Sequence, residues 1–262
     1  MPEHEFDELA EIYEAMIDWP KRLANEQPLF RWVFERAGAR RVLDAACGTG
    51  HHAAMFHSWG LEVEAADVSA AMIQRCRARW GQSDSLRWIV RAFDQPIEAD
   101  QPIEAGGESL RPFDVVVCIG QSLALAPDRA TVARALSAML AAVRRGGGAV
   151  LVHVLNLWKL PDGPCIWQKC RRVQLPGGGD SLIIKGVHRC GDGGYVNVLA
   201  TQLDSDQPTL RSESVPFLGL EAEDLHRIAR AAGAVSVEFF GDYQRSAYDR
   251  AASTDLIMLA SR

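Results

Sequence analysis

The sequence predicts an α/β fold in which a doubly wound, seven-stranded, mainly parallel sheet carries an inserted antiparallel β meander. Two observations support this fold class. Between residues 41 and 154, short apolar runs alternate with longer amphipathic segments, as strands and crossover helices do in a parallel sheet. Between about residues 158 and 220, alternating runs are separated by Gly, Pro and Asp turns, which is typical of consecutive antiparallel strands.

The beginning of the chain is predicted to be helical. Within residues 5–37, apolar side chains recur every three or four positions, as they do on one face of a helix. Pro20 interrupts this pattern, and Gly38 stands where a second helix would end. We therefore expect a helical cap over about residues 1–38.

The main sheet is predicted from seven apolar runs. The expected strands are 41–44, 62–67, 86–90, 113–119, 149–154, 235–240 and 254–260. The expected helices run from a glycine turn to about residue 59 and over 70–80, 129–143 and 221–232. The run at 113–119 is apolar at consecutive positions, as a strand buried on both faces should be.

The meander is expected to be an insertion into this sheet and not a second domain. Its strands are expected at 167–175, 181–190, 195–203 and 209–217. The alternation of helices and strands resumes after them. We therefore expect a single domain over residues 1–262, with the inserted sheet at about 158–220.

Composition restricts the partners and the compartment. The chain is 48% hydrophobic and its formal net charge is -6, so it offers no positive field for a nucleic acid. The acidic start does not resemble a signal peptide, and no run reaches the ~20 apolar residues of a membrane span. The six cysteines lack C-x-x-C spacing, and the histidines at 51, 52 and 57 lack a ligand cluster. We expect a cytoplasmic protein with reduced thiols, no metal and no membrane contact.

The most informative segment is the turn after the first expected strand, Asp-Ala-Ala-Cys-Gly-Thr-Gly at 44–50. Its glycines allow the backbone to turn tightly and to approach a ligand. Ligands of doubly wound sheets lie outside the carboxyl ends of the strands. Asp67 ends the second expected strand, where an acidic side chain takes the ribose hydroxyls of a nucleoside. The turn therefore predicts a nucleoside-binding site.

The residues of the turn favour a ligand without phosphate. A dinucleotide site needs a third glycine, and this sequence has Ala53 at that position. Asp44, just ahead of the turn, would repel a pyrophosphate and would suit a cationic amino-acid tail. These features disfavour a nicotinamide dehydrogenase. They fit S-adenosylmethionine, which carries a sulfonium and an ammonium group and no phosphate.

Two segments carry a resemblance to a known family. Val-Leu-Asp-Ala-Ala-Cys-Gly-Thr-Gly at 42–50 resembles motif I of the class I S-adenosylmethionine-dependent methyltransferases, and Ala-Asp-Val-Ser-Ala-Ala-Met at 66–72 resembles their second motif. The resemblance implies a Rossmann-like fold, S-adenosyl-L-methionine as the cofactor, and methyl transfer as the reaction.

A narrower resemblance is to the glycine and sarcosine N-methyltransferases. It is carried by Phe-Asp-Val-Val-Val-Cys-Ile-Gly-Gln-Ser-Leu at 113–123, by Arg-Gly-Gly-Gly-Ala-Val-Leu-Val at 145–152 and by Gly-Asp-Tyr at 241–243. Together with Asp18-Trp19 near the start and with the meander, the likeness covers nearly the whole chain. It implies a small amine or amino acid, such as glycine or sarcosine, as the methyl acceptor.

The resemblance also implies roles for particular residues. The expected contacts to the amino-acid end of the cofactor are Arg22, Asp44, Ala46, Gly48 and Gly50. The expected contacts to its ribose and adenine are Asp67, Val68, Met72, Phe93 and Asp94. Ile119, Gly120 and Gln121 are expected to face the sulfonium, and Tyr13 and Trp19 to cover the site. Asn156 and Arg172 are the candidates for binding the acceptor.

Other interpretations stay open for several of these residues. Tyr13, Trp19 and Met72 are also suited to a core, Arg22 to a helix surface, and Asn156 to a turn. No catalytic residue is assigned, because aligning the amine with an activated methyl can itself supply ~7–11 kcal/mol of the barrier.

Two departures from the family pattern keep other functions open. The sequence has Gln121 where the family has Asn, and Leu125 where it has His. They leave room for a non-enzymatic cofactor-binding or regulatory protein, or for a methyltransferase with another small-molecule acceptor. Self-association into a homo-oligomer also stays open.

Overall fold

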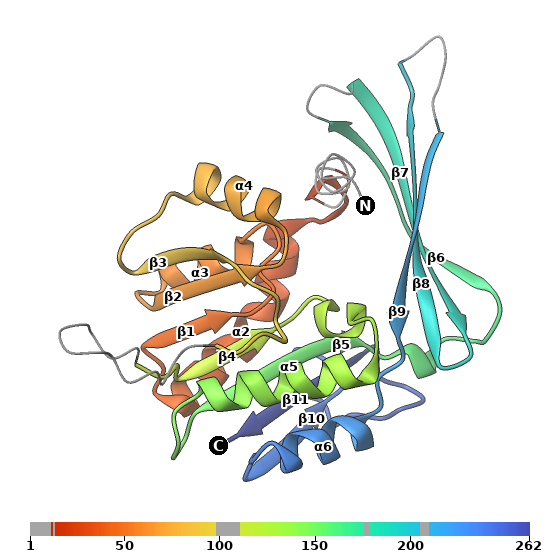
Figure 1. The fold of residues 1–262 in the computed structure, drawn as a ribbon. Helices are drawn as coiled ribbons and strands as arrows, with labels where there is room; N and C mark the ends of the chain where they lie inside the picture. Colours follow the sequence, from red (N-terminus) through yellow and green to blue (C-terminus); the bar gives the residue numbers. More distant parts are fainter. Residues whose placement is uncertain (1–11, 13, 98–110, 176–178, 205–209) are drawn as a thin grey trace.

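The computed structural model describes residues 12, 14–97, 111–175, 179–204 and 210–262 of the chain. These residues form two sheets, one covered by helices and one extending from it (Figure 1). The predicted doubly wound sheet with an inserted antiparallel meander is confirmed. The beginning of the expected helical cap, including Tyr13, lies outside the described residues.

The main sheet has seven strands in the order β10-β11-β5-β4-β1-β2-β3. Their bounds are Arg41–Asp44 (β1), Glu62–Asp67 (β2), Leu86–Val90 (β3), Val115–Cys118 (β4), Ala149–Leu155 (β5), Ser236–Phe240 (β10) and Asp255–Ser261 (β11). The five strands from β3 to β5 are parallel, and β11 runs antiparallel to both of its neighbours. The strand order reverses between β1 and β4, so a ligand site is expected at the carboxyl ends of these two strands.

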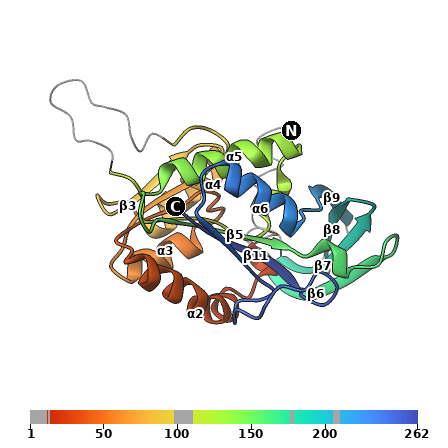
Figure 2. The same ribbon diagram turned by 90° about the horizontal axis from the view of Figure 1, so that it is seen from below.

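Helices cover both faces of this sheet. Their bounds are Trp19–Ala37 (α2), His51–Ser58 (α3), Ala70–Trp80 (α4), Arg129–Ala142 (α5) and Ala222–Ala231 (α6). Figure 2 shows α2 and α3 on one side of the sheet and α5 and α6 on the other. Alternate residues of β4 enter the two cores, with Val116 on the α5 side and Val115 on the α2 side. Both valines are fully buried, as the continuous apolar run predicted.

Helix α2 begins where the sequence placed a break. The side chain of Asp18 accepts a hydrogen bond from the backbone N–H of Lys21, and Pro20 lies in the first turn of the helix. Proline is tolerated there because those N–H groups have no partner within the helix. The helix ends at Gly38, which adopts a left-handed conformation with φ +57°.

The inserted sheet lies between β5 and α6 in the sequence. Its strands are Cys165–Leu175 (β6), Gly179–Cys190 (β7), Gly193–Gln202 (β8) and Leu210–Leu218 (β9), paired in chain order and all antiparallel. Val187 and Phe217 of this sheet belong to the main core. Ile12 and Met16, just before α2, pack on Ile183 and Ala200. The described residues just before α2 therefore pack on the inserted sheet (Figure 1).

Candidate functional site

The glycine turn connects the end of β1 to the start of α3. Gly48 and Gly50 have φ of +52° and +79°, a conformation that favours glycine. A Cβ on Gly50 would lie 2.7 Å from the Trp88 side chain and 2.9 Å from Cys76 Sγ. A Cβ on Gly48 would have no described atom within 4 Å. Gly50 is therefore required for packing, whereas Gly48 borders open space in which a ligand can approach the backbone.

Asp67, at the end of β2, is tied directly to this turn. Its Oδ2 accepts a hydrogen bond of 2.8 Å from the Gly48 N–H, and its Oδ1 accepts one of 3.0 Å from the Ser69 N–H. Burial raises the pKa of this carboxyl. The structure thus places Asp67 beside the turn, as a ribose contact would require. Met72 is partly buried on the next helix, while Val68 is 71% exposed.

Asp44 is the buried acid of the site. It is 1% exposed, and its Oδ1 accepts a long hydrogen bond of 3.4 Å from the Ala46 N–H. Its Oδ2 has no hydrogen-bond partner among the described residues. Burial raises the pKa of Asp44 to about 7. A buried carboxylate oxygen without a partner is costly, so this position fits a cationic ligand group such as the ammonium of S-adenosylmethionine.

The end of β4 forms the opposite side of the site. Gly120 and Gln121 both have positive φ, +75° and +82°. The Gln121 N–H donates to the backbone oxygen of His153 at 3.2 Å, and the Gln121 side-chain oxygen accepts from the Leu155 N–H. A Cβ on Gly120 would lie 3.1 Å from a guanidinium nitrogen of Arg22. The structure therefore brings Arg22 of α2 and Gly120 together, and their contacts to the cofactor stay predictions.

His153 of β5 is a site residue that the sequence analysis missed. Its Nδ1 accepts a hydrogen bond of 3.2 Å from the Gly120 N–H, and its Nε2 lies 3.1 Å from Asp255 Oδ1. This network assigns the proton of a neutral ring to Nε2, which donates to Asp255. The sequence feature that could have indicated this residue is a histidine near the carboxyl end of an otherwise apolar strand.

Helix α2 is joined to α3 by a buried polar network. Arg22 Nε donates to Glu26 Oε1 at 2.9 Å, and His52 Nε2 lies 2.5 Å from Glu26 Oε2. Trp19 stacks on His51, with ring centroids 3.9 Å apart. The histidines of α3 are thus packing residues that position the cap. Trp19 and Arg22 lie next to the glycine turn, while Tyr13 lies outside the described residues.

The other predicted site residues have partners within the protein. Phe93 packs against the main core, and Asp94 accepts from Arg134 at 3.0 Å. Asn156 is 1% exposed; its Nδ2 donates to the Arg250 and Ser253 carbonyls, and its Oδ1 accepts from Trp158 N–H and Tyr248 O–H. Arg172 is exposed and pairs with Asp180. Acceptor binding by Asn156 and Arg172 stays a prediction of the resemblance, and the exposed ion pair with Asp180 argues against it for Arg172.

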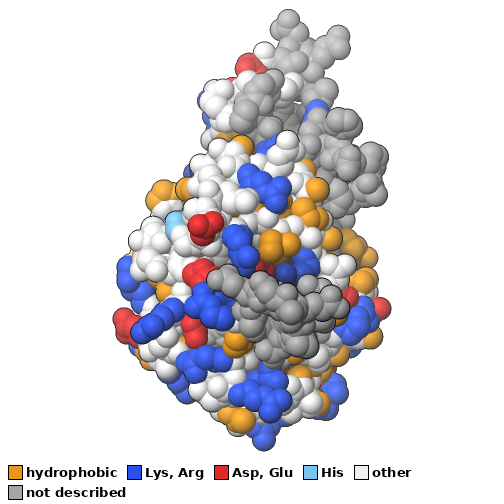
Figure 3. Space-filling view, turned by 60° about the vertical axis from the view of Figure 1, so that its left-hand side comes forward, with side chains coloured by type: hydrophobic (Ala, Val, Ile, Leu, Met, Phe, Trp, Pro, Cys, Tyr) orange, Lys and Arg blue, Asp and Glu red, His pale blue; other side chains and the backbone are white. Residues whose placement is uncertain are grey.

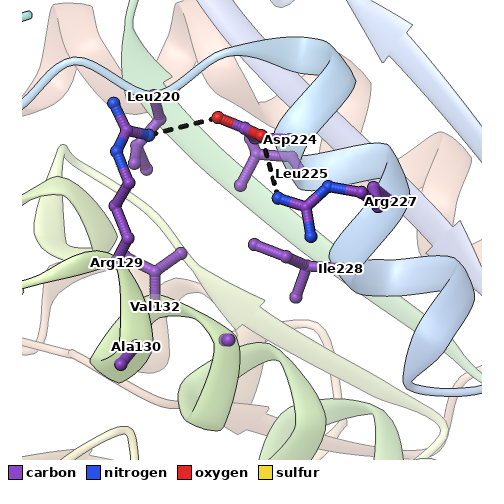
Figure 4. Close-up of a pocket in the computed structure, with 9 residues that line it drawn as sticks. Arg129, Ala130, Val132, Leu220, Asp224, Leu225, Arg227 and Ile228 are labelled. Carbon is purple, nitrogen blue, oxygen red and sulfur yellow. Dashed lines mark hydrogen bonds and ion pairs between the residues drawn. The ribbon is translucent and has the colours of Figure 1, made fainter.

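A separate pocket of about 230 Å³ lies between α5 and α6 (Figure 4). It is lined by Arg129, Ala130, Val132, Ala133, Leu220, Asp224, Leu225, Arg227 and Ile228. Both of its arginines bond Asp224, at 3.3 and 2.9 Å, so its charges are paired. None of the predicted site residues lines this pocket.

The surface carries both signs of charge. Figure 3 shows Lys and Arg side chains spread over one face, with acidic side chains among them. Glu64 pairs with Arg87 at 2.9 Å and with Arg91 at 3.0 Å. Among the described residues, no group of three metal-ligating side chains occurs, and no helix is both long and apolar enough to cross a membrane.

Comparison with known proteins agrees with this geometry. Residues 42–147 match a family of methyltransferase domains. The sugar N-methyltransferase KedS8 from Streptoalloteichus superposes with a TM-score of 0.69 at 23% identity, over 91% of this chain and 87% of that one. The fold, the glycine turn and the family match define a class I S-adenosylmethionine-dependent methyltransferase domain.

Curated relatives point to a narrower group. Glycine N-methyltransferase of Oryctolagus cuniculus is 29% identical over 177 residues, 62% of this chain and 59% of that protein. Glycine/sarcosine N-methyltransferase of Halorhodospira halochloris is 36% identical over 116 residues, 44% of this chain and 40% of that protein. The alignment thus spans less than two thirds of each relative. The chain is similar to these N-methyltransferases over part of its length.

Proposed function

We propose that this protein transfers the methyl group of S-adenosylmethionine to the nitrogen of a small-molecule amine. The observation that carries the proposal is Asp44, a buried carboxylate with an unpaired oxygen beside an open glycine turn. A phosphate ligand would be repelled there, whereas the ammonium of an amino-acid tail supplies the missing partner.

The bound cofactor supplies a methyl group already activated by a sulfonium. The residues of this chain then have to hold and orient the reactants. Asp44 holds the ammonium end, and Asp67 fixes the turn through its hydrogen bond to Gly48. His153 holds the Gly120 backbone on the opposite side. Such alignment is the main requirement of a direct displacement.

The acceptor that the relatives favour is glycine or sarcosine, which their names specify. Two substitutions separate this chain from that pattern, and one of them has a structural role here. The Gln121 side-chain oxygen bonds the Leu155 N–H, so the substitution for Asn preserves a polar side chain that ties β4 to β5.

Isothermal titration with S-adenosylhomocysteine tests the cofactor assignment. We expect binding by the wild-type protein and at least tenfold weaker binding by Asp67→Ala, a loss of about 1.4 kcal/mol, because both oxygens of Asp67 organise the ligand-binding turn. No binding by the wild-type protein would refute the proposal. Unchanged affinity in a folded variant would refute the role of Asp67 alone.

Turnover with a panel of amines separates the enzyme from the binding-protein alternative. Glycine, sarcosine and an amino sugar represent the acceptors named for the relatives. We expect methylation of at least one small amine. Tight cofactor binding without any turnover would instead favour the binding protein.

A further inference from the structure

The inner face of the meander carries a lysine among apolar side chains. Along β7, Ile183, Lys185 and Val187 alternate onto one face, because successive residues of a strand point to opposite sides. Ile183 packs on the N-terminal segment, and Val187 belongs to the main core. Lys185 lies partly buried between these two buried residues. It therefore faces the space between the two sheets.

The charged neighbours of Lys185 are also cations. Lys169 of β6 is the direct cross-strand partner of Lys185. The positive charge of Arg22, on α2, also repels that of Lys185. No described carboxylate forms an ion pair with Lys185. Burial, together with the positive charges of Lys169 and Arg22, lowers the pKa of Lys185 to about 8. A cation held in such surroundings lacks an anionic partner.

This lysine pair lies next to the cofactor site. Arg22 links the two regions, because its guanidinium lies against Gly120 and its charge also acts on Asp44. On its other side, Arg22 acts on both Lys169 and Lys185. The lysines therefore lie on the meander side of Arg22, opposite Gly120.

The local charge exceeds what one carboxylate would balance. Arg22 already pairs with Glu26. On the meander, Lys169 is acted on by Arg22 and Arg171 and by one acid, Asp18. The charged groups that act on Lys185 are both cations, Lys169 and Arg22. Among the described residues, positive charge therefore exceeds negative charge around this lysine pair. An ammonium is a compact point charge that suits a phosphate, whereas a single planar carboxylate is better matched by an arginine fork.

We propose that Lys169 and Lys185 bind a doubly charged anionic part of the methyl acceptor, a phosphate or a pair of carboxylates. This inference rests on the proposed function and specifies its substrate class. The acceptor is then an amine that carries two negative charges, and glycine, with a single carboxylate, is a poorer ligand. The amine nitrogen lies between the lysines and Gly120 and reaches the methyl group from the meander side.

Binding to the complex with S-adenosylhomocysteine tests this without any turnover. The probes are O-phosphoethanolamine, aspartate, glycine and ethanolamine, which carry a phosphate, two carboxylates, one carboxylate and no acid. We expect O-phosphoethanolamine or aspartate to bind at least tenfold more tightly than glycine, and ethanolamine to bind most weakly. Comparison of O-phosphoethanolamine with aspartate shows whether the site prefers a phosphate or a pair of carboxylates.

Lysine variants test whether Lys185 binds the anionic group of the acceptor. We expect Lys185→Met to weaken the binding of the preferred probe at least tenfold. Lys185→Arg, which keeps the charge, should weaken it less. Lys159→Met is the matched control, because Lys159 is an exposed lysine bonded to Thr254 outside this face. Affinity for S-adenosylhomocysteine should stay within twofold of wild type in all three. Where Lys185→Met does not fold, Lys169→Met still measures the contribution of one charge of the pair, and Lys185→Arg tests whether a compact ammonium is required.

Two results would overturn the inference. One is binding of glycine as tight as that of both dianions, with no effect of the lysine variants. The other is a loss of S-adenosylhomocysteine affinity in Lys185→Met, which would assign the lysine to the cofactor. Failure of the wild-type protein to bind S-adenosylhomocysteine would instead refute the proposed function, so the two failures are distinguishable.

Discussion

The carboxyl edge of the main sheet and the inner face of the meander use different means to form their parts of the site. At the sheet edge, backbone N–H groups of Gly48 and Gly120 are held by Asp67 and His153. On the meander, Lys185 projects from a sheet whose β6–β7 pairing shifts register beside Lys169, and it has no ion-pair partner among the described residues. The cofactor region is thus fixed before any ligand arrives, whereas the acceptor region is defined by the side chains that it presents.

The main sheet and the meander also differ in how deeply their strands are buried. All four residues of β4 are fully buried, whereas β9 is mostly exposed. A position in a fully buried strand tolerates few side chains, because packing is dense and added atoms cause strain. A side chain on a half-exposed sheet can change without loss of the fold. The comparison therefore predicts large folding effects at the sheet edge and specific binding effects on the meander.

The largest effect is expected at Gly50. Its Cβ would collide with Trp88 and Cys76, and its φ of +79° disfavours any other residue. We expect Gly50→Ala to lower the free energy of unfolding by about 3–5 kcal/mol, from overpacking and from the left-handed backbone together. Denaturant unfolding of the purified protein measures this loss.

Gly48→Ala is the matched variant within the same turn. Its φ of +52° costs about 1–2 kcal/mol, and no described atom lies within 4 Å of its Cβ. We expect it to fold and to bind S-adenosylhomocysteine at least tenfold more weakly. Equal loss of stability in both glycine variants would show that Gly48 also serves packing and would weaken its assignment to the cofactor.

The same contrast explains what the sequence could predict. The positions of the strands, the glycine turn and Asp67 were predictable because backbone geometry restricts which residues can occupy them. The structure brings Asp44, Arg22 and Gly120 near one another, and the roles that the resemblance implies for them stay predictions. Asp44 and Gly120 combine a local pattern with a fixed place at or just after the end of a strand.

The remaining contacts depend on long-range pairing that no local pattern encodes. His153 meets Gly120 only because β4 and β5 are neighbours in register. The face of the meander to which Lys185 points depends on which residues oppose it across β6 and β8. A shift of one residue would reverse the faces, so the acceptor side of the site could not be predicted from the sequence.

The next prediction concerns the ionisation of Asp44, which we expect to change cofactor affinity about tenfold. Its pKa of about 7 lies above the ordinary value of 3.8 because burial disfavours the ionised form. Cofactor binding needs the carboxylate, so affinity for S-adenosylhomocysteine should rise about tenfold between pH 6 and pH 8. We expect Asp44→Asn to bind more weakly and to lose this pH dependence. A variant with the wild-type pH profile would contradict the assignment of the ammonium to Asp44.

The effect of rising pH on the stability of the unliganded protein has the opposite sign to its effect on cofactor affinity. Because the folded-state pKa is raised, the unliganded protein loses stability as pH rises from about 4 through 7, and the loss persists above that range. Asp44→Asn removes the cost of burying a charge. We expect the unliganded variant to be more stable than wild type at pH 8, on the order of 1–3 kcal/mol. The sheet edge therefore gives up stability for ligand binding at this residue.

The smallest effect is expected at Arg172, on the other face of the meander. Arg172 opposes Leu182 on β7, one position away from the pair formed by Arg171 and Ile183, so its side chain points away from the face of Ile183. It is exposed and pairs with Asp180, and exposed ion pairs contribute little. We expect Arg172→Ala to leave the midpoint of thermal unfolding unchanged and the KM for the acceptor within twofold. A tenfold rise in KM would instead place the acceptor on the outer face of the meander, and the distinction between its two faces would fail.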